Sequence, residues 1–134
     1  MAYFLIALGS ALGGIARYWC SLAVATATGS AFPWGTMTVN VVGSALIGVA
    51  LGVVEPESRW QLPTVTRDFI NHFFMIGVLG GFTTFSSFSL QTLSLIREQH
   101  WGQAGANVVL SVFLCLLAVS LGYWLIASLS HSQS

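Results

Sequence analysis

The chain has 134 residues, of which 55% are hydrophobic and 6% are charged, and its mean hydropathy is +0.81. Soluble domains carry roughly 25% charged residues, so this chain lacks the charge to cover a water-exposed surface, and its expected solvent is a lipid bilayer. The net charge is zero, which gives no support for nucleic-acid binding, and two cysteines, Cys20 and Cys115, form neither a disulfide framework nor a metal-ligand spacing.

The apolar pattern predicts an all-α integral membrane protein, with residues 1–134 as a single transmembrane domain. A spanning helix needs roughly 20 mainly apolar residues. Four segments meet this condition, at approximately residues 3–26, 34–54, 69–96 and 104–128. The connection at residues 55–68 holds five of the eight charged residues and two of the three prolines.

The charges specify the orientation in the membrane only weakly. With four spans, Arg59 and Arg67 lie on the side of the two termini, and Arg97 lies on the opposite side. A bias of two against one barely decides the orientation under the positive-inside rule. Two readings stay open: a single orientation fixed by Arg59 and Arg67, or insertion in both directions, which would permit an antiparallel dimer.

Small residues recur every four positions in the first two spans, as in helices that approach each other closely. We expect these stripes to serve helix packing. They consist of Ser10 and Gly14 in the first span, and of Ser44, Gly48 and Gly52 in the second.

Two polar side chains lie inside the first two spans. Arg17 stays charged and needs water, carbonyl oxygens or an acid, so it is either structural or a source of positive potential near an anion entrance. Asn40 is costly in hydrocarbon unless it is hydrogen-bonded. It either ties one helix to another or donates from its NH2 group to a passing anion.

The third span is longer than a membrane requires. Between Asp68 and Arg97 lie 28 uncharged residues, which as straight helix would extend roughly 42 Å, against roughly 30 Å of hydrocarbon. The surplus predicts a tilt or a break. At residues 77–89 the sequence reads G-V-L-G-G-F-T-T-F-S-S-F-S. Either Gly80-Gly81 marks unwound backbone, whose free carbonyl oxygens suit a hard cation, or the helix is kinked and its glycines serve packing.

Three phenylalanines of this stretch share one helical face, because Phe82, Phe85 and Phe88 are spaced by three. Their positive ring edges can attract a small anion, with hydroxyl donors from Ser86 and Ser89 nearby; the alternative is simple packing. In the fourth span, a second polar face consists of Asn107, Ser111 and Cys115. It either lines a path or bonds to backbone carbonyls.

The positions of the acidic residues argue against an enzyme and against proton-coupled transport. All four lie in connections or at span ends, so no carboxylate is placed to carry a proton at mid-membrane. The histidines are dispersed, and no nucleophile has a base close in sequence. The acidic residues are Glu55, Glu57, Asp68 and Glu98.

The third-span motif resembles the signature of the Fluc (CrcB) family of fluoride channels. The segments G-G-I-A-R-Y-W at residues 13–19 and G-T-M-T-V-N at residues 35–40 resemble the same family. The resemblance covers nearly the whole chain. It implies a dual-topology homodimer of antiparallel bundles with two fluoride pores, in which the third helices break at their centre and cross.

The resemblance also implies the site residues. A structural sodium ion would be held at the dimer centre by the backbone carbonyls of Gly80 and Thr83, and no organic cofactor is expected. The fluoride pathway would be lined by Asn40, Phe85, Phe88, Ser86, Ser111 and Cys115. Arg17 is assigned an electrostatic or structural role.

The chain departs from the family pattern at several positions. Phe82 replaces an aliphatic residue and is left out of the pore, and Ser87 replaces a common threonine. Gln91 stands where a glutamate is expected, which puts a role for charge there in doubt. Cys115 replaces a hydroxyl with a weaker donor.

The expected function is passive export of cytoplasmic fluoride across the bacterial plasma (inner) membrane. One alternative is a small dual-topology multidrug or cation transporter, which would need an embedded acid that the spans lack. The other is a non-transporting assembly subunit, for which the small-residue stripes would suffice.

Overall fold

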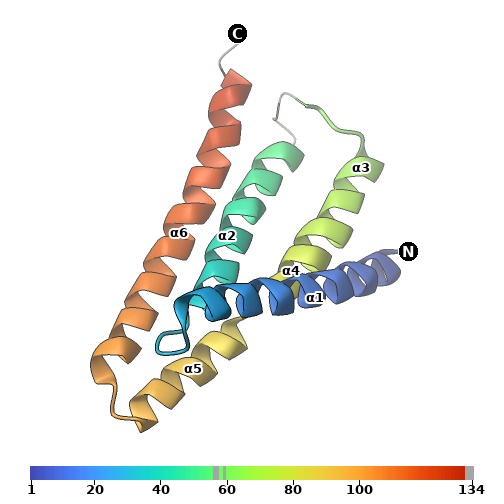
Figure 1. The fold of residues 1–134 in the computed structure, drawn as a ribbon. Coiled ribbons are helices and arrows are strands. Elements are labelled where there is room, and N and C mark those ends of the chain that lie inside the picture. The colour runs from blue at the N-terminus through green and yellow to red at the C-terminus, as the bar shows by residue number, and fades with distance from the viewer. Residues whose placement is uncertain (56–57, 59, 132–134) are drawn as a thin grey trace.

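The computed structural model describes residues 1–55, 58 and 60–131, and within them every regular element is a helix (Figure 1). In this described part of the chain, four stretches are long and apolar enough to cross a membrane, so the prediction of a helical multi-pass membrane protein is confirmed. They are Ala2–Thr28, Trp34–Val54, Thr64–Arg97 and Trp101–Leu129. Arg59 and Glu57, which entered the charge argument, lie outside the described residues.

The first two spans are single helices, α1 (Ala2–Thr28) and α2 (Trp34–Val54). Gly29 ends α1 with φ of 80°, a left-handed conformation that glycine adopts without strain. Pro33 precedes α2, where its missing N–H removes no helical hydrogen bond. The last span is α6 (Trp101–His131), which packs mainly against α2.

The third span consists of four pieces: α3 (Thr64–Phe69), the π-helix η1 (Ile70–Leu79), α4 (Gly80–Phe82) and α5 (Phe85–Arg97). Between α4 and α5 the backbone is extended, with φ and ψ of −81° and 157° at Thr83 and of −153° and 113° at Thr84. The predicted break is therefore present. It falls after the Gly80-Gly81 pair, which is still helical.

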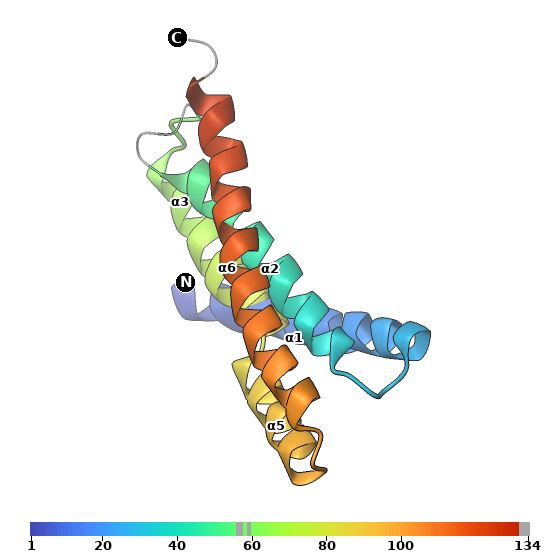
Figure 2. The ribbon, with the colours of Figure 1, turned by 90° about the vertical axis from the view of Figure 1, so that its left-hand side faces the viewer.

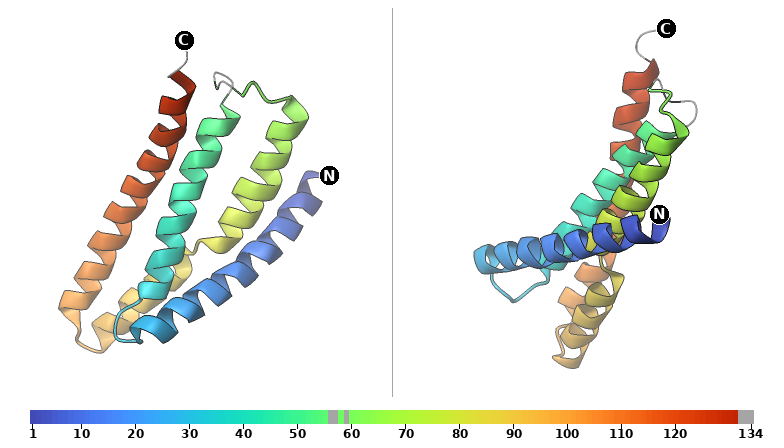
Figure 3. Two further views of the ribbon diagram at one scale, coloured as in Figure 1. Left: turned by 45° about the horizontal axis from the view of Figure 1, so that its top comes forward. Right: turned by 90° about the vertical axis from the view of Figure 1, so that its right-hand side faces the viewer.

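The helix α1 crosses the others at a large angle, whereas α2, α6 and the third span run side by side (Figures 1, 2 and 3). It packs mainly on η1. At this crossing the backbones touch: a Cβ atom on Gly9 would lie 2.9 Å from the Cα atom of Gly77, and one on Gly81 would lie 2.9 Å from the Cα atom of Ser10. Gly81 thus has a packing role.

Part of the small-residue prediction is confirmed. Gly48 and Gly52 lie against α6, where added Cβ atoms would lie 3.0 Å from the amide nitrogen of Tyr123 and 2.9 Å from the Cβ atom of Ile126. Gly14 was wrongly assigned to such a contact, because the nearest atom to its added Cβ is a side-chain nitrogen of Arg17, 4.0 Å away. Gly13, one residue earlier, faces the third span.

Candidate functional site

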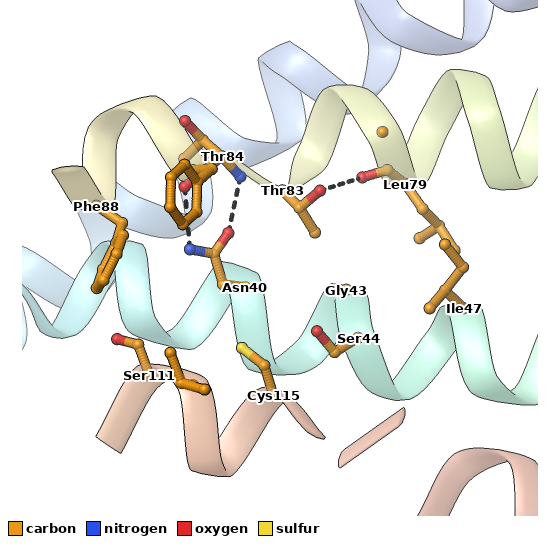
Figure 4. A pocket seen from close by; sticks show the side chains of 13 residues that line it. Asn40, Gly43, Ser44, Ile47, Leu79, Thr83, Thr84, Phe88, Ser111 and Cys115 are labelled. Carbon is orange, nitrogen blue, oxygen red and sulfur yellow. Dashed lines mark hydrogen bonds between the residues drawn. The ribbon is translucent and has the colours of Figure 1, made fainter. Parts of the chain in front are cut away.

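The break in the third span is held by one side chain from α2. Asn40 Nδ2 donates to the carbonyl oxygen of Thr84 over 3.1 Å, and the backbone N–H of Thr84 donates to Asn40 Oδ1 over 2.7 Å (Figure 4). Thr84 is only 7% exposed, so both of its backbone groups need partners inside the protein. The amide of Asn40 supplies the acceptor that the N–H of Thr84 lacks at the break, and it adds a second donor to the carbonyl of Thr84, which as an N-cap carbonyl already accepts the first bond of α5.

Beyond the break, α5 starts as a new helix with its own N-cap. Thr84 Oγ1 accepts from the backbone N–H of Ser87 over 3.2 Å and donates to Ser87 Oγ over 3.1 Å, and it lies 3.1 Å from Ser86 Oγ. This is the arrangement by which a threonine satisfies free N–H groups at a helix start. The positive end of the α5 dipole therefore lies in the middle of the third span.

The same rearrangement deprives two carbonyl oxygens of their usual partners. In an unbroken helix, the N–H of Thr84 would bind the carbonyl of Gly80, and the N–H of Ser87 would bind that of Thr83. Both N–H groups donate to side-chain oxygens instead. The carbonyl oxygen of Thr83 lies 3.4 Å from Arg17 Nη1, which reaches it from α1.

A cavity of about 310 Å³ lies next to the break, between α2, the third span and α6. No charged side chain is among the thirteen that line it (Figure 4). They are Asn40, Gly43, Ser44, Ile47, Leu79, Gly80, Thr83, Thr84, Phe85, Phe88, Ser111, Val112 and Cys115.

Most residues of the predicted site meet at this cavity, although they come from three different spans. The two exceptions are Ser86, whose hydroxyl lies against Thr84, and Arg17, which contacts the break from α1. The others line the cavity: Asn40, Gly80, Thr83, Phe85, Phe88, Ser111 and Cys115.

The two predicted pore phenylalanines differ in burial. Phe88 is 9% exposed and forms an inner wall of the cavity, whereas Phe85 is 77% exposed and lies at its rim. Their ring centroids are 5.3 Å apart, with the planes tilted by 44°. Phe82 does not line the cavity; its ring lies 3.4 Å from the position of a Cβ atom on Gly43.

A second polar cluster connects α5 to α6 behind the cavity wall. Ser111 Oγ donates to Asn107 Oδ1 over 3.3 Å, and Asn107 Nδ2 donates to Thr92 Oγ1 over 2.8 Å. Thr92 Oγ1 in turn donates to the carbonyl oxygen of Phe88 over 2.8 Å. Asn107 is 2% exposed and does not line the cavity. Asn107 and Ser111 on the polar face of the fourth span therefore bond to side chains rather than to their own helix backbone.

Sequence reasoning missed two residues of this arrangement, Thr84 and Thr92. A local signal existed for Thr84, because a threonine before Phe-Ser-Ser is a good N-cap. The partner of Thr92 is 15 positions away in the chain, so no local pattern indicates it.

The carboxylates that the structure describes lie at or near span ends. Glu55 directly follows α2 and accepts from the hydroxyl of Tyr123 over 3.0 Å, Glu98 directly follows α5, and Asp68 lies near the start of the third span. None of these carboxylates lines the cavity.

The sequence matches the family model described as "CrcB-like protein, Camphor Resistance (CrcB)" over residues 4–123. The chain belongs to the CrcB family. A relative from Opitutus terrae, named "Fluoride-specific ion channel FluC", is 55% identical over 121 residues, which cover 90% of this chain and 89% of the relative. Proteins of the same name from Paramagnetospirillum magneticum and Methylocella silvestris are each 52% identical over 123 residues, covering 92% of this chain and 93% and 91% of those proteins.

Membership of the CrcB (Fluc) family confirms the resemblance inferred from the three motifs. It also confirms that the chain is not an enzyme, because these relatives are named as ion channels. The match covers about nine-tenths of this chain and of each relative, so it includes the break and all the cavity-lining residues.

Proposed function

We propose that this CrcB-family chain conducts fluoride passively, through the cavity beside the break in the third span. The observation that carries the proposal is the cavity itself, which is lined by an amide, by hydroxyl groups and by two phenylalanine rings, and by no charged side chain. The relatives named as fluoride-specific channels supply the identity of the ion.

The lining suits a small, strongly hydrated anion. Fluoride that leaves water needs replacement donors, and a donor of this kind is the second N–H of Asn40 Nδ2, which its bond to Thr84 leaves over. The edges of the Phe85 and Phe88 rings and the nearby start of α5 add positive potential without a full charge. Ser111 and Cys115 continue the polar lining along α6. Ser86 would contribute through its contact with Thr84.

The functional unit in this proposal is an antiparallel homodimer with two pores. Phe85, Leu90 and Leu93 are exposed on α5, and Gly80 is exposed at the break. A second copy of the chain would cover this apolar face and close the open side of each cavity. Insertion in both directions, which the weak charge bias permits, would supply that copy.

The proposal includes a structural sodium ion at the dimer centre. The carbonyl oxygens of Gly80 and Thr83 are the two whose helical N–H partners bind side chains instead, and carbonyl oxygens are natural ligands of a hard cation. Two copies of the chain would supply four such oxygens. A carbonyl oxygen has two lone pairs, so Thr83 can accept from Arg17 and still face a cation.

We place the dimer in the bacterial inner membrane, where it would let cytoplasmic fluoride leave the cell. The rival, a multidrug or cation transporter, needs an acidic residue in its binding site, and the cavity is lined by none. The small-residue contacts would equally serve a non-transporting subunit.

Efflux from liposomes tests the conduction. Purified protein is reconstituted with fluoride inside, and release is followed with a fluoride electrode as a potassium ionophore prevents charge build-up. We expect rapid release of fluoride and far slower release of chloride. Folded protein that releases no fluoride would overturn the proposal, and release that requires a proton gradient would favour a transporter.

The rings give a narrower prediction. Phe85→Ile and Phe88→Ile remove the positive ring edges while keeping an apolar side chain, and we expect fluoride efflux to fall at least roughly tenfold. Phe113→Ile is the matched control, because Phe113 is exposed on α6 and does not line the cavity. Wild-type efflux in both cavity variants would place the pathway elsewhere.

The sodium ion has its own test. Protein is extracted and purified with N-methyl-D-glucamine as the only cation, and its dimer fraction is measured by cross-linking. We expect a smaller dimer fraction and slower efflux, both restored by added sodium. A dimer fraction and efflux that do not depend on sodium would remove the ion from the proposal.

A further inference from the structure

Three hydrogen bonds link Ser111 on α6 to the backbone of α5, and all three point in one direction, from the Ser111 hydroxyl toward α5. Ser111 donates to Asn107, Asn107 donates to Thr92, and Thr92 donates to the carbonyl oxygen of Phe88. A carbonyl oxygen can only accept, so the last bond fixes the direction of the other two. Ser111 lines the cavity, but its hydrogen is directed at the amide behind it.

This direction is unsuitable for an anion. With its hydrogen engaged, Ser111 presents lone pairs to the cavity, and lone pairs repel fluoride. The hydroxyl becomes a donor to the cavity only if Asn107 stops accepting from it. Because Asn107 is 2% exposed, its oxygen would then need another partner within the protein.

A half-turn of the Asn107 amide provides that partner. The oxygen and nitrogen ends of an amide have nearly the same shape, so the turn exchanges donor and acceptor without moving neighbouring atoms. Both neighbours of Asn107 are hydroxyls, which can reverse. After the turn, Thr92 donates to Asn107 Oδ1, Asn107 Nδ2 donates to Ser111 Oγ, and the Ser111 hydrogen is free to face the cavity.

The number of hydrogen bonds decides when this reversal occurs. The observed arrangement has three bonds, and the reversed one has two within the protein plus one from Ser111 to an anion. Without an anion, the reversed arrangement has one hydrogen bond fewer than the observed one. With an anion bound to Ser111, the two arrangements have the same number of hydrogen bonds. Phe88 loses only an extra bond, since its carbonyl retains its helical N–H partner. A hydroxyl that itself accepts a hydrogen bond is also a stronger donor.

We propose that Asn107 is a positioning residue whose side-chain amide turns over when an anion enters the cavity, and thereby converts Ser111 into a hydrogen-bond donor. The weakest link of the observed cluster is the 3.3 Å bond between Ser111 and Asn107, against 2.8 Å for the next bond, so the cluster opens most readily at the cavity end. The inference rests on the proposed fluoride conduction.

A double-mutant cycle tests whether Asn107 acts through Ser111. Fluoride efflux from liposomes is compared for wild type, Asn107→Leu, Ser111→Ala and the double variant. We expect each single variant to lower efflux roughly fivefold, as the loss of about one hydrogen bond implies. The double variant should match Ser111→Ala within a factor of about two, because Asn107 then has no hydroxyl to orient.

Two results of this cycle would overturn the inference. One is wild-type efflux in Asn107→Leu, and the other is a double variant that falls by the product of the two single effects. In both cases wild-type protein still conducts, so the proposed function stands. Wild-type protein without any fluoride efflux would remove the proposed function and the inference together.

Thr92 provides a second test that leaves Asn107 in place, in case the leucine variant fails to fold. Thr92→Val keeps the shape of the side chain but cannot donate to the turned amide, so efflux should fall by a factor of about three. Thr92→Ser retains the hydroxyl and should restore at least half of wild-type efflux. Equal efflux in the valine and serine variants would contradict the inference.

A spectroscopic measurement reports on the amide without relying on flux. The chain has three asparagines, at positions 40, 71 and 107, so ¹⁵N labelling of asparagine side chains gives three assignable NH2 signals. Sodium fluoride should shift the Asn107 signal, whereas the same concentration of sodium chloride should not, and the shift should vanish in Ser111→Ala. An Asn107 signal unchanged by fluoride would overturn the inference.

Discussion

Two asparagine amides lie at or behind the cavity wall, the half-buried Asn40 and the buried Asn107, and they differ in what they bind. Asn40 binds the N–H and the carbonyl of one peptide-backbone residue, Thr84. Asn107 binds two hydroxyls, those of Thr92 and Ser111. Backbone N–H and carbonyl groups have fixed polarity, whereas a hydroxyl can donate or accept. The orientation of Asn40 is therefore locked, and that of Asn107 is reversible.

The difference shows how one residue type serves two purposes in a membrane protein. A buried amide is a rigid clamp when its partners are backbone groups, because a turn would place two donors and two acceptors face to face. The same amide becomes adjustable when its partners are hydroxyls. Asn40 thus maintains the break that shapes the cavity, and Asn107 adjusts the chemistry of its wall.

The largest expected effect is at the clamp. Asn40→Leu leaves the N–H of Thr84 without a partner and removes the second donor to its carbonyl, and an unsatisfied buried group costs about 1–3 kcal/mol. We expect a protein with a lower thermal unfolding temperature in detergent, measured by circular dichroism, and with fluoride efflux reduced more than roughly tenfold.

Asn71→Leu is the matched control for Asn40→Leu. Asn71 is exposed on η1, so the same substitution should leave the unfolding temperature and the efflux close to wild type. If both leucine variants unfold at the wild-type temperature, the break does not depend on the amide of Asn40, and the contrast between the two asparagines fails.

A smaller effect is expected at the N-cap of α5. A substitution there tests the side chain of Thr84 separately from its backbone groups. Thr84→Val removes the oxygen that accepts from Ser87 but keeps both backbone bonds to Asn40. Loss of a threonine N-cap costs about 1 kcal/mol, so the unfolding temperature should fall by a few degrees. Thr84→Ser keeps the oxygen and should unfold close to wild type. A valine variant as stable as wild type would show that α5 needs no cap.

The sequence predicts the spans and the break well, because both depend on local composition. Four apolar segments are evident without any partner information, and the excess length of the third indicates an interruption. The sequence predicts the position of the break less well. The Gly80-Gly81 pair suggests unwinding at the glycines, but Gly81 packs on Ser10. The backbone instead becomes extended at Thr83 and Thr84, where Asn40 supplies hydrogen bonds from 44 positions away.

The candidate site shows the same division between local and distant information. Motif resemblance places Asn40, Phe88 and Ser111 in one pathway, and the structure brings them to one cavity. The cluster of Thr92 with Asn107 depends on how α5 and α6 pack, which a single sequence does not reveal. The spacing on α6 placed Asn107 on one helical face with Ser111 and Cys115, but it did not predict the hydrogen bond of Asn107 to Thr92.

The smallest expected effect concerns Cys115, which lines the cavity one turn beyond Ser111 on α6, the helix that carries the reversible amide of Asn107. A thiol is a weaker hydrogen-bond donor than a hydroxyl, so Cys115→Ser should offer fluoride a better contact and raise efflux up to about threefold. Cys20→Ser, on α1 and away from the cavity, is the matched control and should leave efflux unchanged. Efflux that falls in Cys115→Ser would mean that the pathway at this position favours an apolar, polarisable surface, and that the polar lining ends at Ser111.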